Sequence, residues 1–136
     1  MTVLLDTNVL IDAAVVSRSY HGTAVRLIAA AERDTIDGLV APTSIAPCWN
    51  VAHEREDTDP RPHLDLLADV MRFAPMHRSL LRTALQNPET NEIVDRYLPH
   101  AGTSANVSAI ATRPETDRVS LPLMPYHRLA LSALLA

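Results

Sequence analysis

The chain has 136 residues, 47% of them hydrophobic, and one cysteine, which fits a single soluble domain (residues 1–136) in a reducing compartment such as the cytoplasm. No apolar run approaches the roughly 20 residues that span a bilayer, so we expect no membrane segment. The formal net charge is −4, and all 12 basic residues are arginine. Any nucleic-acid binding must therefore come from a local patch and metal ions, because the whole molecule is not basic.

The first half of the chain predicts strands that alternate with helices. Hydrophobic spacing, turn residues and prolines set the limits of each element. The expected elements are a strand at 3–5, helices at about 8–16 and 22–33, a strand at 39–41, a helix from 44, a polar loop at 54–62 and a helix from 62. Thr43 or Ser44 is available as the N-cap of the third helix, and Pro47 falls in its first turn.

The second half continues the alternation with shorter segments. We expect a strand at 73–74, helices at about 79–86 and 91–98, strands at 107–111 and 121–124, and a short C-terminal helix. Strands separated by helices pair in parallel through right-handed crossovers. The predicted fold is therefore α/β, a three-layer α/β/α sandwich around a short, mainly parallel, Rossmann-like sheet.

Several carboxylates fall where such a sheet binds ligands. Asp6 follows the first strand, and the loop after Thr112 contains Asp117, so both should project from the carboxyl edge of the sheet. Glu92 and Asp95 lie three residues apart, on one face of the predicted 91–98 helix. Clustered carboxylates would suit Mg²⁺ or Mn²⁺ and metal-assisted phosphodiester cleavage. Taken singly, each acid also has a structural interpretation, as a helix cap, a solvated helix face or a turn.

The segment Val3–Asp12, with the sequence VLLDTNVLID, resembles the opening of PIN domains, and especially of VapC-type toxin ribonucleases. Further similar segments follow in the family's order, at 19–31, 41–51, 112–117 and 121–124. The resemblance implies a PIN-like domain that acts as a Mg²⁺-dependent endoribonuclease, the toxin of a type II toxin–antitoxin pair. Its implied partners are an RNA substrate, a small antitoxin protein and a second copy of the chain.

The resemblance also implies roles for individual residues. Asp6 and Asp95 would be the catalytic metal ligands, with Asp117 as a further candidate for the metal. Glu92 has no strong counterpart in the family and is a possible local replacement one turn from Asp95. Asn8, Thr112 and Arg113 would orient a ligand, position water or contact the substrate.

Two prolines depart from the family pattern. Pro47 stands where the third helix usually carries Glu, although Asn50 of that Glu-x-x-Asn pattern is kept. Pro114 stands where the loop after Thr-Arg usually carries Asn or Asp. The alternative is therefore a catalytically degenerate PIN-like domain that binds RNA or a protein partner without cleavage.

The first predicted helix suggests how copies of the chain would associate. Its apolar residues between Val9 and Val16 exceed what one buried stripe requires. We expect this helix to expose apolar surface and to form a homodimer through it.

Overall fold

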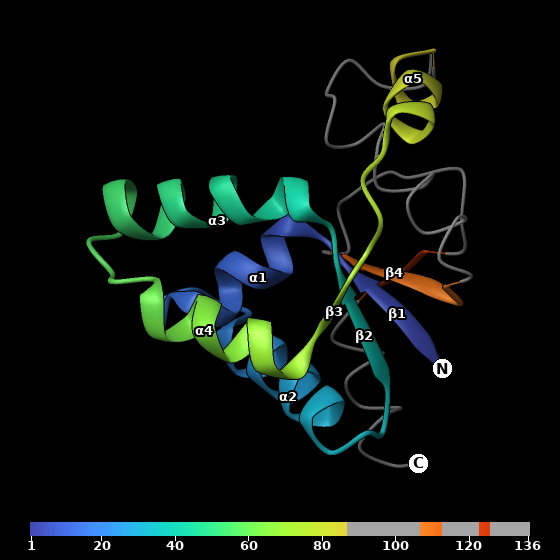
Figure 1. Cartoon of the computed structure of the whole chain (residues 1–136). Coiled ribbons are helices and arrows are strands. Elements are labelled where there is room, and N and C mark those ends of the chain that lie inside the picture. Colours follow the sequence, from blue (N-terminus) through green and yellow to red (C-terminus); the bar gives the residue numbers. More distant parts are fainter. Residues whose placement is uncertain (87–106, 113–122, 126–136) are drawn as a thin grey trace.

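The computed structural model describes residues 1–86, 107–112 and 123–125, and these contain a five-stranded parallel sheet (Figure 1). The strand order is β3-β2-β1-β4-β5, and every neighbouring pair is parallel. The strands are β1 (Thr2–Leu5), β2 (Asp37–Val40), β3 (Arg72–Phe73), β4 (Ala109–Thr112) and β5 (Leu123–Pro125). The predicted α/β class and parallel sheet are confirmed.

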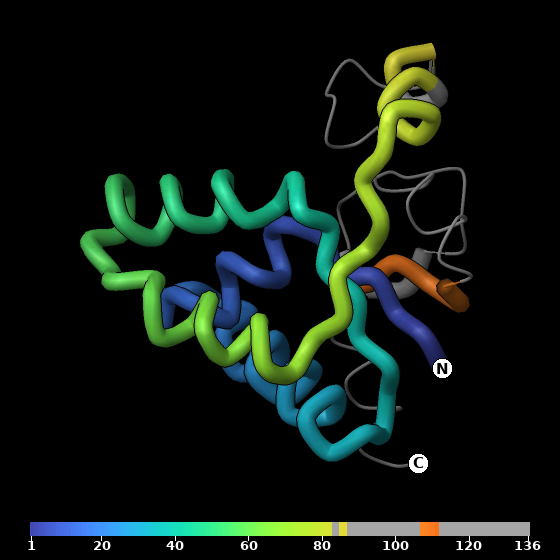
Figure 2. The backbone as a smooth tube through the Cα atoms, in the orientation of Figure 1, coloured from blue at the N-terminus to red at the C-terminus, as the bar shows by residue number. Residues whose placement is uncertain are grey.

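The helices of the first half cover one face of this sheet. They are α1 (Thr7–Ala14), α2 (His21–Glu32), α3 (Ile45–Asn50) and α4 (Arg61–Val70), and in Figure 1 all four lie on the same side. The fifth helix, α5 (Arg78–Gln86), stands apart from them at the end of a segment that Figure 2 follows from α4 through β3. A 3₁₀ turn, η1 (Pro42–Ser44), leads into α3, and a π-helical turn, η2 (Val51–Arg55), extends it.

The strand order explains the layers. The chain moves from β1 to β2 and β3 in one direction across the sheet, whereas β4 and β5 lie on the other side of β1. Right-handed crossovers that run in opposite directions leave the sheet on opposite faces. The arrangement is consistent with the small three-layer α/β/α fold expected from the sequence.

The predicted elements that fall on described residues lie within a few residues of the observed ones. The polar stretch from Glu54 was expected to be a loop, but the helix of α3 continues through η2 to Arg55. Trp49 and His53 stack along this extension, with ring centroids 5.5 Å apart. The predicted helix at 91–98 and the C-terminal helix lie outside the described residues.

The core is built around β1 and α1. Val3, Leu4 and Leu5 of β1 are fully buried, as expected for a central strand of a parallel sheet. Helix α1 packs against both α2 and α3, and its residues from Val9 to Ala13 are all buried. Apolar residues lie all round α1 because protein surrounds it.

This packing corrects one expectation. The apolar surface of the first helix was predicted to be exposed and to form a homodimer, but only Val16, which lies beyond the helix end, is strongly exposed, at 79%. The excess of apolar residues is buried inside one chain, so the expected exposed surface on α1 is wrong, while the homodimer itself stays a prediction.

None of the helices in the described part of the chain combines the length and apolar character needed to cross a membrane.

Candidate functional site

The carboxyl edge of the sheet brings together the ends of β1 and β4. Leu5 pairs with Ala111, and the backbone N–H of Asp6 donates to the Ala111 carbonyl at 3.0 Å. Asp6 therefore lies beside Thr112, which closes β4. The strand order changes direction between these two strands, and open α/β sheets bind ligands at such a point. The predicted placement of Asp6 and Thr112 at one edge is confirmed.

The Asp6 carboxylate is buried, with the residue only 2% exposed. Its Oδ1 accepts a hydrogen bond of 2.8 Å from the backbone N–H of Thr7, and Asp6 is the N-cap of α1. The structural interpretation of Asp6 as a helix cap is thus correct. The two oxygens offer about four lone-pair positions. A carboxylate can therefore both hold a helix start and ligate a metal.

Two hydroxyl groups link the neighbouring strand ends. The Thr7 hydroxyl donates to Ser44 Oγ at 2.7 Å, and Ser44, which follows β2 through η1, is fully buried. Ser44 is the N-cap residue of α3, as the sequence allowed, but its side chain makes no capping hydrogen bond. The hydroxyl instead ties the segment after β2 to the segment after β1.

A third hydroxyl group at this edge, that of Thr43, makes no hydrogen bond. Thr43 Oγ1 is buried and has no hydrogen-bond partner. Sequence reasoning assigned Thr7 and Ser44 no site role and considered Thr43 only as a cap. The signal that would have found them is their position, since hydroxyl residues follow two adjacent parallel strands. They place hydroxyl oxygens at the ends of β1 and β2, and oxygen is the donor that Mg²⁺ prefers.

The other predicted site residues divide into two groups. Asn8 lies half-buried in the first turn of α1, and Thr112 ends β4. Asp95, Glu92, Asp117 and Arg113 lie outside the described residues, as does Pro114, so the predicted meeting of Asp6 with Asp95 stays a prediction. Within residues 1–86, 107–112 and 123–125, no three His, Cys, Asp or Glu side chains come together as a metal site.

Helix α3 carries the position where an acid was expected. Pro47 is the third residue of α3 and is half-buried, in the first turn as predicted. Glu54, seven residues further on, lies in the η2 extension and is exposed. At 1.5 Å per residue the two positions are about 10 Å apart along the axis. Glu54 therefore does not take the place of the missing acid.

Cys48 and His63 belong to the packing. Cys48 of α3 is fully buried, and burial raises the pKa of its thiol to about 11, so it is a core residue and not a thiolate. His63 of α4 is half-buried, and its Nε2 has no hydrogen-bond partner. Burial lowers the pKa of His63 below 6.5, against the opposing effect of a hydrogen bond with the Leu10 backbone.

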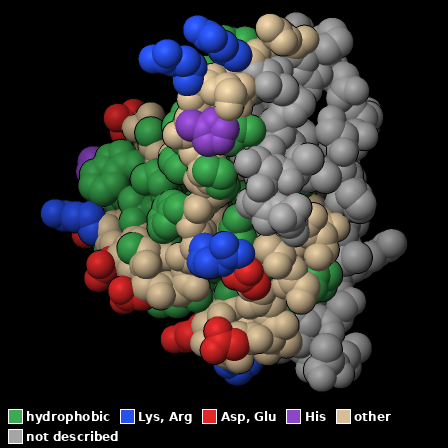
Figure 3. Space-filling view, turned by 45° about the vertical axis from the view of Figure 1, so that its right-hand side comes forward, with side chains coloured by type: hydrophobic (Ala, Val, Ile, Leu, Met, Phe, Trp, Pro, Cys, Tyr) green, Lys and Arg blue, Asp and Glu red, His purple; other side chains and the backbone are tan. Residues whose placement is uncertain are grey.

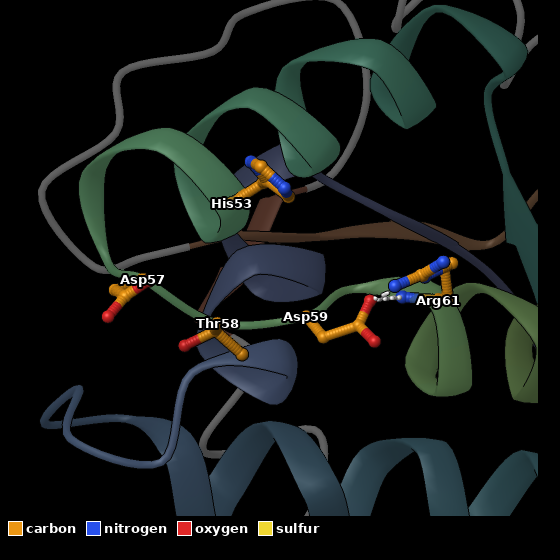
Figure 4. Close-up of a pocket in the computed structure, with 5 residues that line it drawn as sticks. All are labelled: His53, Asp57, Thr58, Asp59 and Arg61. Carbon is orange, nitrogen blue, oxygen red and sulfur yellow. Dashed lines mark hydrogen bonds and ion pairs between the residues drawn. The ribbon is translucent and has the colours of Figure 1, made fainter.

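A separate polar hollow of about 250 Å³ lies between η2 and α4 (Figure 4). Its lining side chains are His53, Asp57, Thr58, Asp59 and Arg61. Arg61 Nε and Asp59 Oδ1 form an ion pair at 2.9 Å, and both side chains are more than half exposed. The charges of Arg61 and Asp59 in this hollow thus offset each other.

Comparison with known proteins gives no match: no protein-family model fits the chain, and no curated protein resembles its sequence.

Proposed function

We propose that this chain is a PIN-like, metal-dependent endoribonuclease that acts as the toxin of a type II toxin–antitoxin pair. The observation that supports the proposal is the Asp6 carboxylate, buried at the carboxyl edge of β1 and beside the end of β4. Parallel α/β folds bind their ligands at the point where the strand order reverses, and Asp6 lies at this point. The proposal also rests on the family-like sequence from Val3 to Asp12.

The groups around Asp6 fit a hard divalent cation. Thr7, Thr43 and Ser44 supply hydroxyl oxygens at this edge, and Mg²⁺ or Mn²⁺ prefers oxygen ligands and keeps several waters. Asp6 and Asp95 would hold the ion, with Asp117 and Glu92 as further ligands. A bound Mg²⁺ would supply Lewis-acid stabilisation of the phosphodiester and activation of a water. The first-turn Asn8 would orient the Asp6 carboxylate, Thr112 would position the water, and Arg113 would contact a phosphate.

A second candidate function has its own observation. Pro47 occupies the α3 position where the resemblance implies a metal-binding Glu, and a proline side chain offers no oxygen. A site that lacks this acid, and the loop acid replaced by Pro114, would bind metal weakly because affinity depends on ligand charge and number. The alternative is a domain that binds RNA or a protein partner without cleaving.

The two functions are separated by a cleavage assay on a mixed RNA pool in millimolar Mg²⁺ or Mn²⁺. We expect slow cleavage by the wild type, none in EDTA and none in Asp6→Ala. Pro47→Glu should raise the rate, because α3 accepts a residue with a backbone N–H in its first turn. Cleavage that survives both EDTA and Asp6→Ala would exclude a metal nuclease. An inactive wild type with recovery in Pro47→Glu would establish the degenerate domain instead.

The partners follow from the same proposal. We propose a cytoplasmic protein that is neutralised by a small antitoxin and that pairs with itself through a surface other than α1. Co-expression with the short reading frame expected directly upstream of the gene tests the antitoxin, and light scattering at high concentration tests the dimer. A toxic wild type that no upstream product neutralises would contradict the toxin–antitoxin assignment.

A further inference from the structure

The segment from β3 to the end of α5 differs in charge from the rest of the molecule. Residues 72–86 contain three arginines and no Asp or Glu, in a chain whose net charge is −4. Arg72 is paired with Asp37 of the neighbouring strand. Arg78 and Arg82 belong to none of the ion pairs formed among the described residues. Among the described residues, therefore, two arginines without an acidic partner lie together in a segment that contains no acid.

Arg78 and Arg82 lie on one face of α5. They are four residues apart, so they stand one helical turn and about 6 Å apart along the axis, and both are exposed. Figure 3 shows arginine side chains, and no carboxylate beside them, on the described part of the end of the molecule that α5 forms. His77 anchors the start of this helix, because its Nδ1 accepts a hydrogen bond from the Leu80 N–H at 3.4 Å. The cations are thus presented on a regular helix.

An exposed aromatic ring stands where this segment leaves the sheet. Phe73 is the last residue of β3 and is 45% exposed. The Ala74 N–H donates to the Val40 carbonyl at 2.9 Å, which extends the β2–β3 pairing by one hydrogen bond beyond Phe73. All strands are parallel, so β3 ends at the same edge as β1, two strands away, or about 10 Å. The ring and the helix that follows therefore start from the edge that carries Asp6.

We propose that Phe73, Arg78 and Arg82 form a binding arm for single-stranded RNA, with the bases stacking on Phe73 and the phosphates contacting the arginines. Proteins that bind single strands combine these two features, an aromatic platform and a positive track along the backbone. The exposed Leu81 and Leu85 add apolar surface against which bases can lie. This inference rests on the proposed ribonuclease function, because it supplies that function's substrate path to Asp6.

The arm can be tested without cleavage. Binding of a fluorescent single-stranded RNA of mixed sequence is measured by anisotropy in EDTA, in an Asp6→Ala background and over a series of salt concentrations. The double variant Arg78→Gln/Arg82→Gln should bind roughly tenfold more weakly at 0.1 M salt, and the slope of log K against log salt should fall by about 1.4, or 0.7 per lost contact. Phe73→Ala should weaken binding at least about fivefold.

The matched control removes the same charge elsewhere. Arg26 and Arg33 are exposed on and just after α2 and belong to no ion pair among the described residues, so Arg26→Gln/Arg33→Gln should bind like the parent protein. Equal weakening in both double variants, or none in the α5 variant, would overturn the arm. Competition by poly-glutamate as strong as that by RNA would also overturn it and assign the surface to an acidic protein partner. Folding of each variant is checked by circular dichroism.

Failure of the arm and failure of the nuclease proposal give different results. If Asp6-dependent cleavage occurs while the α5 variants bind RNA normally, the arm is wrong and the nuclease stands. If the α5 variants lose RNA binding while cleavage does not depend on Asp6, the arm stands and the nuclease is wrong.

Discussion

Helices α1 and α5 are both rich in apolar residues, but they occupy opposite situations. Residues Val9 to Ala13 of α1 are buried without interruption between α2, α3 and the sheet. Of the α5 side chains that the structure describes, only Leu80 is buried, and Leu85 is 54% exposed. Apolar composition therefore does not by itself indicate a docking surface. The place of a helix in the topology decides whether its apolar side chains form core or surface.

The largest difference between the two helices should appear in the free energy of unfolding when Leu10 and Leu85 are each replaced by alanine. Leu10 of α1 is fully buried, so Leu10→Ala should lower the free energy of unfolding by about 2–5 kcal/mol through lost burial and a residual cavity. The matched change Leu85→Ala on α5 should shift it by less than about 0.5 kcal/mol. Urea unfolding of both variants measures this. Similar losses in the two would contradict the assignment of α1 to the core and α5 to the surface.

A smaller effect is expected from the ion pair at the end of α1. Asp12 is fully buried, and its Oδ1 lies 2.8 Å from Arg18 Nε, while Arg18 also lies 3.6 Å from Glu56. Asp12→Ala should cost about 1–3 kcal/mol, below the usual cost of breaking a buried pair, because Arg18 is 21% exposed and keeps Glu56.

The exposed pair between Asp59 and Arg61 is the matched control for Asp12. Arg61→Ala, which removes this pair but leaves the hydrogen bond from the backbone N–H of residue 61 to Asp59, should leave the urea midpoint unchanged, since solvent screens the pair. Equal effects of the two substitutions would show that burial at α1 does not strengthen the interaction.

The smallest effect is a pH dependence that arises where α4 packs beside α1. Burial lowers the pKa of His63 below 6.5, so the folded chain holds the imidazole neutral. As the pH falls below about 6.5, the unfolded chain takes up a proton that the folded chain does not, and the free energy of unfolding falls until the folded pKa is reached. His63→Leu should remove this decline between pH 7 and 5. The exposed His53→Gln is the control, and an unchanged decline in His63→Leu would refute the assignment.

The sequence predicted the sheet more completely than the site. Alternating short apolar strands and amphipathic helices specify β1, α2 and β2, because burial on a parallel sheet demands that pattern. It did not predict the extension of α3 to Arg55, since polar residues such as Glu54 suit both a loop and a solvated helix. The Thr7–Ser44 hydrogen bond joins residues 37 positions apart, and only the strand order brings such residues together. The position of Asp6 was predictable because it depends only on where one strand, β1, ends.

The claim that Asp6 marks a metal site is tested most directly by Mn²⁺ binding, followed by electron paramagnetic resonance. Asp37 provides the matched control, because it begins β2 and lies at the opposite edge of the same sheet. We expect the wild-type protein and Asp37→Asn to bind Mn²⁺ with the same affinity, and Asp6→Asn to bind it about tenfold more weakly or worse. Undiminished binding by Asp6→Asn would contradict the claim.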